Sequence, residues 1–302
     1  MKSMDGIIEA ARKAGRKRIA VAAAQEESAL EAVIDAYRHG LAQPILIGDV
    51  QLIRKMAATI GAAMGVDVSG FQLIDEKDFA ASAARAVALV RAGEADMLMK
   101  GVLDTSILLK AVLNKETGLN AGRLTSHVGV MEVPTYHKLL IVTDGAINIA
   151  PDLAGKLDII TNAVQVAKAL GIELPKVALL AAVEKVNPDK MPCTADAAIL
   201  TQMNRRGQIK GCLVDGPLAL DNAISAESAR IKKIVSEVAG DADILVSPDI
   251  EAGNILYKCL LDLGNAKGAG IVVGAAKPVV LTSRSDSAET KLASIALAAL
   301  TS

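Results

Sequence analysis

Apolar and polar residues alternate along this chain in a pattern that predicts short strands separated by helices. Residues 19–24 and 44–47 are apolar runs of strand length, and residues 26–39 carry apolar side chains at helical spacing. The same alternation continues with a helix at 49–64, a strand at 71–74, a helix at 78–92 and a strand at 95–99. Four strands with intervening helices predict a parallel sheet with right-handed crossovers.

The pattern changes near residue 120, after which a second series of elements begins. Two apolar runs, 128–133 and 138–142, are separated by so few residues that they predict an antiparallel pair. Helices are then predicted at 152–170, 194–205, 225–239 and 253–263, and strands at 176–183, 211–215 and 243–247. The remaining strands, 270–273 and 278–282, are too few for a domain and are expected either to return to the first sheet or to bridge the two domains. We therefore predict one α/β domain from residues 1–124 plus 270–302, with a second α/β domain, 125–269, inserted into it.

The composition narrows the kind of interior and the kind of partner. Hydrophobic residues make up 52% of the chain but aromatic residues only 2%, which predicts an interior of Ala, Val, Ile and Leu. The 33 basic and 34 acidic residues nearly cancel, so no net field favours nucleic acid or anionic lipid. Because aromatic residues are scarce, the chain also lacks the usual stacking platform for the bases of single-stranded nucleic acid. We expect neither a nucleic-acid nor a membrane partner.

The cysteines and the first residues point to a cytoplasmic protein. Cys193, Cys212 and Cys259 lie far apart without metal-type spacing, so we expect free thiols in a reducing compartment and no bound metal. Residues 1–18 read as a charged helix rather than a signal peptide. Apolar runs are interrupted before they reach the roughly 18 residues that a membrane span needs.

Common catalytic signatures are missing, but polar clusters follow the predicted strands. The chain has no GxxxxGK[ST], HExxH or GxSxG motif, and its late glycines do not fit GxGxxG. His127 and His137 lack an adjacent acidic or cysteine partner, which favours structural roles. Six polar clusters lie at strand ends: Lys100-Gly101, Arg123 with Ser126, residues 143–148, residues 215–217, residues 247–254 and Ser283-Arg284. Such loops bind ligands in open α/β sheets, so together they predict a site for an anionic ligand with many oxygens.

Three of these stretches carry a family resemblance. Residues 143–148, TDGAIN, resemble the D-x-A-x-N segment of the phosphate acetyl/butyryltransferases. Residues 251–258 are similar to their A-G-N-x-x-Y-K helix start, and residues 278–284 to their P-V-x-x-L-S-R segment. Length and order agree over essentially the whole chain. A resemblance to the butyryl branch in particular is found at residues 99–101, 113–116, 126–128 and 207–221.

The resemblance implies a fold and a reaction. The expected fold is two three-layer α/β domains with a cleft between them, similar to the isocitrate/isopropylmalate dehydrogenases, in a homodimer or higher homo-oligomer. The expected reaction is butyryl-CoA + phosphate = butyryl phosphate + CoA, by direct thiolate attack in a ternary complex. Coenzyme A is then a substrate and no cofactor is bound permanently. The partners implied are butyryl-CoA or acetyl-CoA and orthophosphate, in butanoate metabolism.

The resemblance also assigns roles to residues. Ser283 is expected to stabilise the transition state, Arg284 to bind phosphate, and Asp286 to be a candidate base. Acetyltransferases place a carboxylate seven residues after that serine, where this chain has Thr290. Asp286 and Glu289 also have the spacing of a helix N-cap and its third residue, so a capping role competes with catalysis. The predicted substrate-binding residues are Lys100, Lys110, Arg123, Ser126, Asp144, Asn148, Gly253 and Asn254.

Three other readings stay open. Phosphate acetyltransferase differs from the butyryl enzyme only in the space around the acyl chain. A non-catalytic ligand-binding module on the same fold is kept open by the missing family carboxylate at Thr290. A dehydrogenase is suggested by the fold alone, without a dinucleotide glycine motif or a clustered set of metal-binding carboxylates.

Overall fold

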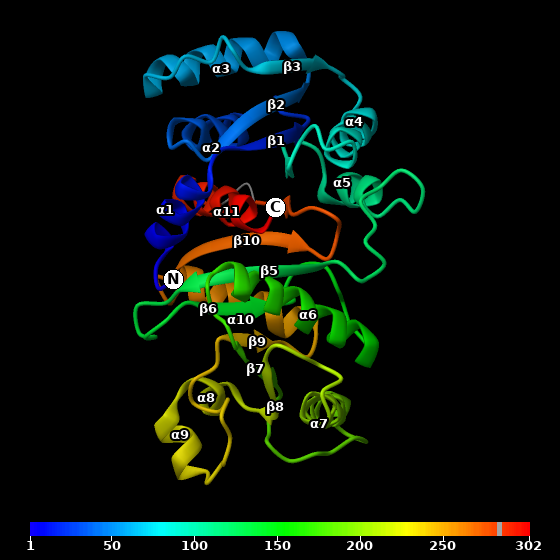
Figure 1. Cartoon of the computed structure of the whole chain (residues 1–302), viewed down its shortest axis with the longest axis vertical. Coiled ribbons are helices and arrows are strands. Elements are labelled where there is room, and N and C mark those ends of the chain that lie inside the picture. The colour runs from blue at the N-terminus through cyan, green and yellow to red at the C-terminus, as the bar shows by residue number, and fades with distance from the viewer. Residues whose placement is uncertain (283–285) are drawn as a thin grey trace. The chain divides into compact units, whose positions relative to one another are not determined.

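The computed structural model of the chain describes residues 1–282 and 286–302, and these have a mixed α/β fold. They divide into two compact units. One, which we call the flanking unit, consists of Met4–Arg123 with Ala269–Ser302. The other, the central unit, consists of Met1–Ser3 with Leu124–Gly268. Figure 1 labels most of the elements of both units.

The sheet of the flanking unit is largely parallel. Its strands follow the order β3-β2-β1-β4-β11-β10. Parallel pairing joins β3 to β2, β2 to β1, β1 to β4 and β4 to β11, whereas β10 runs antiparallel to β11. The predicted parallel sheet and the return of the last strand to it are confirmed. The strands are β1 (Lys17–Ala22), β2 (Ala42–Gly48), β3 (Gln72–Asp75), β4 (Met97–Lys100), β10 (Lys267–Val273) and β11 (Val279–Val280).

Two helices of this unit begin where an aspartate side chain caps their first amides. Asp49 caps one helix by accepting from Gln51 N and Leu52 N, and Asp78 caps the next by accepting from Ala81 N. Such caps supply acceptors for amides that the helix itself leaves unpaired. The helices are α1 (Met4–Ala14), α2 (Glu27–Arg38), α3 (Val50–Met64), α4 (Phe79–Arg91), α5 (Thr105–Val112) and α11 (Ala288–Thr301).

α11 lies in the interior of the flanking unit. Figure 1 shows α11 beside α1. The helix packs against α1, α2 and β11, and its residues from Lys291 to Ala299 are all buried. A helix covered on all sides is expected to be apolar around its circumference. Alanines, leucines and isoleucine supply most of these positions, in agreement with the predicted aliphatic interior.

Within the central unit, the strand order is β5-β6-β9-β7-β8. β5 and β6 pair antiparallel, as their short connection predicts, and β6, β9, β7 and β8 pair in parallel. The strands are β5 (Ser126–Glu132), β6 (Leu140–Thr143), β7 (Lys176–Leu180), β8 (Leu213–Leu218) and β9 (Ile244–Val246). The helices are α6 (Leu153–Ala169), α7 (Pro192–Arg205), α8 (Leu220–Ile224), α9 (Ala226–Ile231) and α10 (Ile250–Asp262).

The predicted helix over residues 225–239 is wrong. Helix α9 ends at Ile231, and Lys233 adopts a positive φ of 56° that a right-handed helix excludes. Further along, the Ser236 hydroxyl accepts from Val238 N and Ala239 N. Serine side chains that bond to nearby amides offer the backbone an alternative to the helix. The helical pattern in the sequence therefore stops early in the structure.

No helix within residues 1–282 and 286–302 combines the length and the apolar character that spanning a bilayer requires.

Candidate functional site

The flanking unit has a topological switch point between β1 and β4, where ligands bind in open α/β sheets. The residues after both strands meet there. Gly101 N donates to Ala22 O at 2.8 Å, and Val102 N donates to Ala23 O at 2.9 Å. A Cβ on Gly101 would overlap the carbonyl oxygen of Ala23, so only glycine allows this approach. The predicted Lys100-Gly101 cluster is thus part of a closely packed edge of the sheet.

Lys100 organises the loop that follows β4. Its half-buried ammonium donates to Gly101 O at 3.0 Å and to Leu103 O at 3.3 Å. These contacts fix the backbone between β4 and α5. The loop ends at Asp104, which is the N-cap residue of α5 without a side-chain capping bond. The structure therefore places the Lys100 cation at the carboxyl edge of the sheet.

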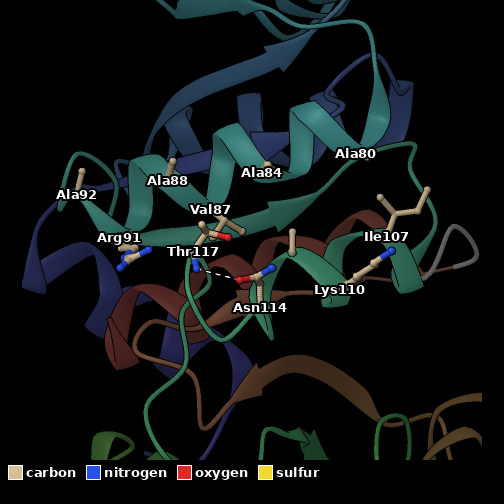
Figure 2. Close-up of a pocket in the computed structure, with 11 residues that line it drawn as sticks. Ala80, Ala84, Val87, Ala88, Arg91, Ala92, Ile107, Lys110, Asn114 and Thr117 are labelled. Atoms are coloured by element: carbon tan, nitrogen blue, oxygen red, sulfur yellow. Dashed lines mark hydrogen bonds between the residues drawn. The ribbon is translucent and has the colours of Figure 1, made fainter.

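A cavity of about 870 Å³ lies between α4 and α5 (Figure 2). Its apolar wall consists mainly of alanines, with the exposed Ala80, Ala84 and Ala88 spaced four residues apart along α4. Two cations, Arg91 and Lys110, line it without any acidic residue among the lining side chains. An apolar wall with two cations suits a ligand that combines an apolar ring with phosphate groups.

The polar end of this cavity is built by the segment after α5. Asn114 Oδ1 accepts from Thr117 N at 2.9 Å (Figure 2). It also accepts from Glu116 N at 2.9 Å. Arg91 Nη1 donates to the carbonyl of Glu116. Arg91 therefore links α4 to the turn formed by residues 114–117. Lys110 is exposed, so its ammonium is accessible to a ligand in the cavity.

In the central unit, Asp144 shapes the loop after β6. The carboxylate is only 2% exposed, and its Oδ1 accepts from Ala146 N at 2.9 Å and Ile147 N at 3.1 Å. Its Oδ2 accepts from Asn148 N at 3.2 Å and from Asn148 Nδ2 at 2.7 Å. Asn148 Nδ2 also donates to Thr125 O at 2.9 Å. Both carboxylate oxygens are thus occupied by hydrogen bonds within the loop.

The start of α10 packs directly on this loop. Gly253 is buried, and a Cβ at this position would overlap the carbonyl oxygen of Asp144. The neighbouring Asn254 donates from Nδ2 to Gly145 O at 2.9 Å. The structure therefore brings together the segments 143–148 and 251–258, which are about a hundred residues apart in the chain and which sequence spacing alone does not pair.

Two further predicted substrate-binding residues lie close together in the sequence but belong to different units. Arg123, at the end of the Met4–Arg123 segment, is half-buried. Ser126 is fully buried, and its hydroxyl accepts from Asn162 Nδ2 at 2.9 Å. That burial favours a structural role for Ser126 over direct contact with a substrate.

The loop after β11 holds the predicted catalytic residues. Ser283 and Arg284 lie outside the described residues. Asp286 is half-buried, but it is not the cap of α11 as its spacing predicts: the N-cap is Ser287, whose hydroxyl accepts from Thr290 N at 3.1 Å. The same hydroxyl donates to Thr290 Oγ1 at 3.1 Å. Thr290, at the position of the family carboxylate, therefore belongs to the start of this helix.

The chain as a whole was compared with known proteins. Residues 3–84 and 77–299 match the family model described as Phosphate acetyl/butaryl transferase. The chain belongs to this family. It is 51% identical to a phosphate butyryltransferase of Clostridium acetobutylicum over 99% of this chain and 98% of the relative. It is 47% identical to a phosphate acetyltransferase of Thermotoga maritima, over 98% of this chain and 99% of the relative.

A solved structure agrees with this assignment. The crystal structure of a branched-chain phosphotransacylase from Enterococcus faecalis V583 matches with a TM-score of 0.81 and 36% sequence identity. The match covers 94% of this chain and 98% of that one. The chain is accordingly a phosphate acyltransferase, and the predicted resemblance and enzyme class are confirmed.

One buried cation of this phosphate acyltransferase was missed by sequence reasoning. Lys291 is 4% exposed and lies four residues after the cap of α11. Its signal in the sequence is a lysine that directly precedes the alanine- and leucine-rich run 292–300. Within residues 1–282 and 286–302, no group of three or more His, Cys, Asp or Glu side chains is arranged to hold a metal ion.

Proposed function

We propose that this chain is a phosphate butyryltransferase, which catalyses the reversible reaction butyryl-CoA + phosphate = butyryl phosphate + CoA. The observation that carries the proposal is the 51% identity to the phosphate butyryltransferase of Clostridium acetobutylicum over nearly the full length of both chains. The alternative substrate is acetyl-CoA, supported by the 47% identity to the acetyltransferase of Thermotoga maritima.

The proposed chemistry is direct transfer within a ternary complex. In the direction of CoA acylation, the thiolate sulfur attacks the acyl carbonyl carbon and forms a tetrahedral oxyanion. The bond between that carbon and the phosphate oxygen then breaks, and orthophosphate leaves. The thiol proton must pass to a base, the oxyanion needs a hydrogen-bond donor, and the phosphate needs cations. We propose Asp286 as the base and Ser283 as the donor to the oxyanion. We propose Arg284 as a cation that binds the phosphate.

We further propose that the cavity between α4 and α5 holds the phosphorylated nucleotide end of coenzyme A. Lys110 and Arg91 would neutralise its phosphates, while the alanines of α4 and α5 would contact its adenine ring. The support is the lining itself, which has two cations, no carboxylate and an apolar wall. Lysine acts here as a point charge rather than as a bidentate fork.

The remaining predicted residues mainly fix the backbone of the loops in which they lie. Asp144, Asn148, Gly253 and Asn254 fix the loop after β6 against α10. We propose that this loop presents its backbone to the substrate. Lys100 has the corresponding role after β4, where its ammonium bonds two carbonyls of its own loop. Arg123 and Ser126 stay predicted substrate-binding residues, although the burial of Ser126 makes it the weaker of the two.

Organisation and context are proposed from the family resemblance. We propose two three-layer α/β domains, the second inserted into the first, in a homodimer or higher homo-oligomer. Coenzyme A is a substrate in this scheme and no cofactor is held permanently. A role in butanoate metabolism follows from the choice of butyryl-CoA as substrate. We also propose a cytoplasmic location, because widely spaced cysteines without metal-type spacing fit a reducing compartment.

The proposal is tested by mixing the purified chain with acyl-CoA and orthophosphate and following the release of free thiol. We expect phosphate-dependent release with a higher kcat/KM for butyryl-CoA than for acetyl-CoA. A reaction without phosphate controls for simple thioester hydrolysis. A preference for acetyl-CoA would select the alternative substrate, and a lack of phosphate-dependent thiol with both esters would refute the activity.

A further inference from the structure

The two buried lysines among residues 1–282 and 286–302 differ in their surroundings. Lys156 of α6 is 7% exposed, and its ammonium pairs with Asp196 Oδ2 at 2.6 Å. Lys291 of α11 is 4% exposed, and its ammonium has no ion pair and no side-chain hydrogen bond within those residues. Buried lysines are rare unless they are paired. Lys291 therefore lacks, within the described part of the chain, the kind of partner that Lys156 has.

The position of Lys291 along its helix makes an unpaired charge more unfavourable still. α11 begins at Ala288, so Lys291 lies at the end of its first turn. The amino end of a helix carries a partial positive charge, which stabilises anions and opposes cations. This unfavourable interaction is relieved when an anion binds beside the ammonium.

Lys291 also lies where a substrate of this fold is expected. Long helical side chains lean towards the amino-terminal turn of their helix. One turn further along α11, Ser294 Oγ accepts from Gly270 N of β10 and donates to Thr290 O, so this side of the helix faces the sheet. β11 pairs with β4 up to Val280 and Met99, and β4 ends at the next residue, Lys100. The start of α11 thus follows the same carboxyl edge of the sheet that holds Lys100.

We propose that Lys291 binds the orthophosphate substrate, which is the phosphoryl group of the acyl phosphate in the reverse direction. This assignment rests on the proposed phosphate acyltransferase reaction. A lysine with 4% exposure is accessible only to a small anion, which favours orthophosphate over the bulky phosphates of coenzyme A. Those phosphates have other cations in Arg91 and Lys110. A compact ammonium charge suits a small tetrahedral dianion that arrives and leaves in each turnover.

The test replaces the charge and keeps the apolar stem, in the variant Lys291→Met. We expect the KM for orthophosphate to rise by about tenfold or more, whereas the KM for butyryl-CoA stays within about twofold. Without phosphate, the Tm of the variant is expected to equal or exceed that of the wild type, because an unpaired buried charge has been removed. Addition of orthophosphate should raise the Tm of the wild type but not that of the variant.

Two further variants separate a binding role from a structural one. Lys291→Arg keeps the charge and is expected to recover part of the phosphate affinity. Lys156→Met is the matched control for removing a buried lysine. It should lower the Tm, because Asp196 loses its partner, and leave the KM for orthophosphate unchanged.

Three results would overturn the assignment. One is an unchanged KM for orthophosphate in folded Lys291→Met, and another is a rise confined to the KM for butyryl-CoA. The third is a Lys291→Met variant that fails to fold while Lys291→Arg folds, since the ammonium would then stabilise the unliganded protein. Failure of the proposed reaction is distinguishable, because it appears in the wild type as a lack of thiol release. The phosphate-dependent Tm of wild type and variant still reports on Lys291 in that case.

Discussion

The contact between Gly253 and the Asp144 loop allows a substitution with a predictable sign. Gly253 lies within α10, where replacing glycine by alanine ordinarily gains up to about 1 kcal/mol of helix stability. A Cβ at Gly253, however, would overlap Asp144 O and lie 3.0 Å from Gly145 Cα. Both of these neighbouring atoms belong to the backbone, so α10 must move away from the Asp144 loop to make room for the Cβ. We therefore expect Gly253→Ala to destabilise the protein.

The magnitude follows from three contributions. Forcing an extra carbon into a packed contact costs about 1–3 kcal/mol. Moving α10 also breaks the hydrogen bond from Asn254 Nδ2 to Gly145 O, with a net loss of about 1 kcal/mol. After subtracting the helix gain of about 1 kcal/mol, the free energy of unfolding should fall by about 1–3 kcal/mol.

Urea denaturation followed by circular dichroism measures this change. The matched control is Gly70→Ala, because a Cβ there meets no atom within 4 Å and its φ is not in the left-handed region. That control should be neutral or gain up to about 1 kcal/mol. If Gly253→Ala were as stable as the wild type, the close approach of α10 to the Asp144 loop would be refuted. Because the Asp144 loop would be displaced, Gly253→Ala should also raise the KM for acyl-CoA or for orthophosphate.

Two further predictions concern the cavity and a charge cluster. Lys110→Ala should raise the KM for acyl-CoA by about tenfold and leave the KM for orthophosphate within about twofold, as expected when one charged contact to a phosphate is lost. Lys115→Ala, which removes an exposed lysine outside the cavity lining, is its control, and equal effects of the two would contradict the assignment. Asp241 faces Lys138, Lys176 and His137. Burial raises the pKa of Asp241, but hydrogen bonds from Lys176 and Lys138 outweigh it and hold the pKa well below its ordinary value. A lowered folded-state pKa contributes stability above about pH 4 that is lost as the pH falls further. Asp241→Asn should therefore cost about 1 kcal/mol at pH 7, since solvent screens a partly exposed pair, and progressively less in acid. Thermal melts at several pH values check this, and a cost that does not change with pH would contradict it.

Local signals in the sequence were sufficient for most of the fold. Apolar runs of four to six residues between helical patterns marked the parallel strands, and the short gap at 134–137 marked the antiparallel pair of β5 and β6. The pattern failed at 225–239, where apolar spacing continued but the Ser236 hydroxyl bonded to nearby amides. A side chain that competes with the helix cannot be recognised from periodicity, because periodicity records only which positions are apolar.

The candidate site was predictable in its segments but not in its contacts. The loop at 143–148 was singled out as a polar cluster, and 251–258 by its family resemblance. Their meeting through Gly253 and Asn254 depends on the tertiary fold. Lys291 was missed for the same reason. A lysine at the start of a helix is ordinarily exposed, and only the packing of α11 against α1 and α2 shows that this one is buried.

The hydrogen bonds of the carboxylates narrow the search for the base of the transfer reaction. Asp144 is an unsuitable base, because taking a proton would weaken four hydrogen bonds that hold its loop. Thr290, at the position of the family carboxylate, has no acidic group and contributes its amide to the cap of α11. Ser287 performs that capping, so the alternative explanation for Asp286 in the sequence, that it caps the helix, no longer applies. Of the carboxylates that the sequence brought forward at this loop, Glu289 is exposed on the helix and Asp286 is half-buried next to it. Asp286 therefore stays the proposed base, which remains a prediction.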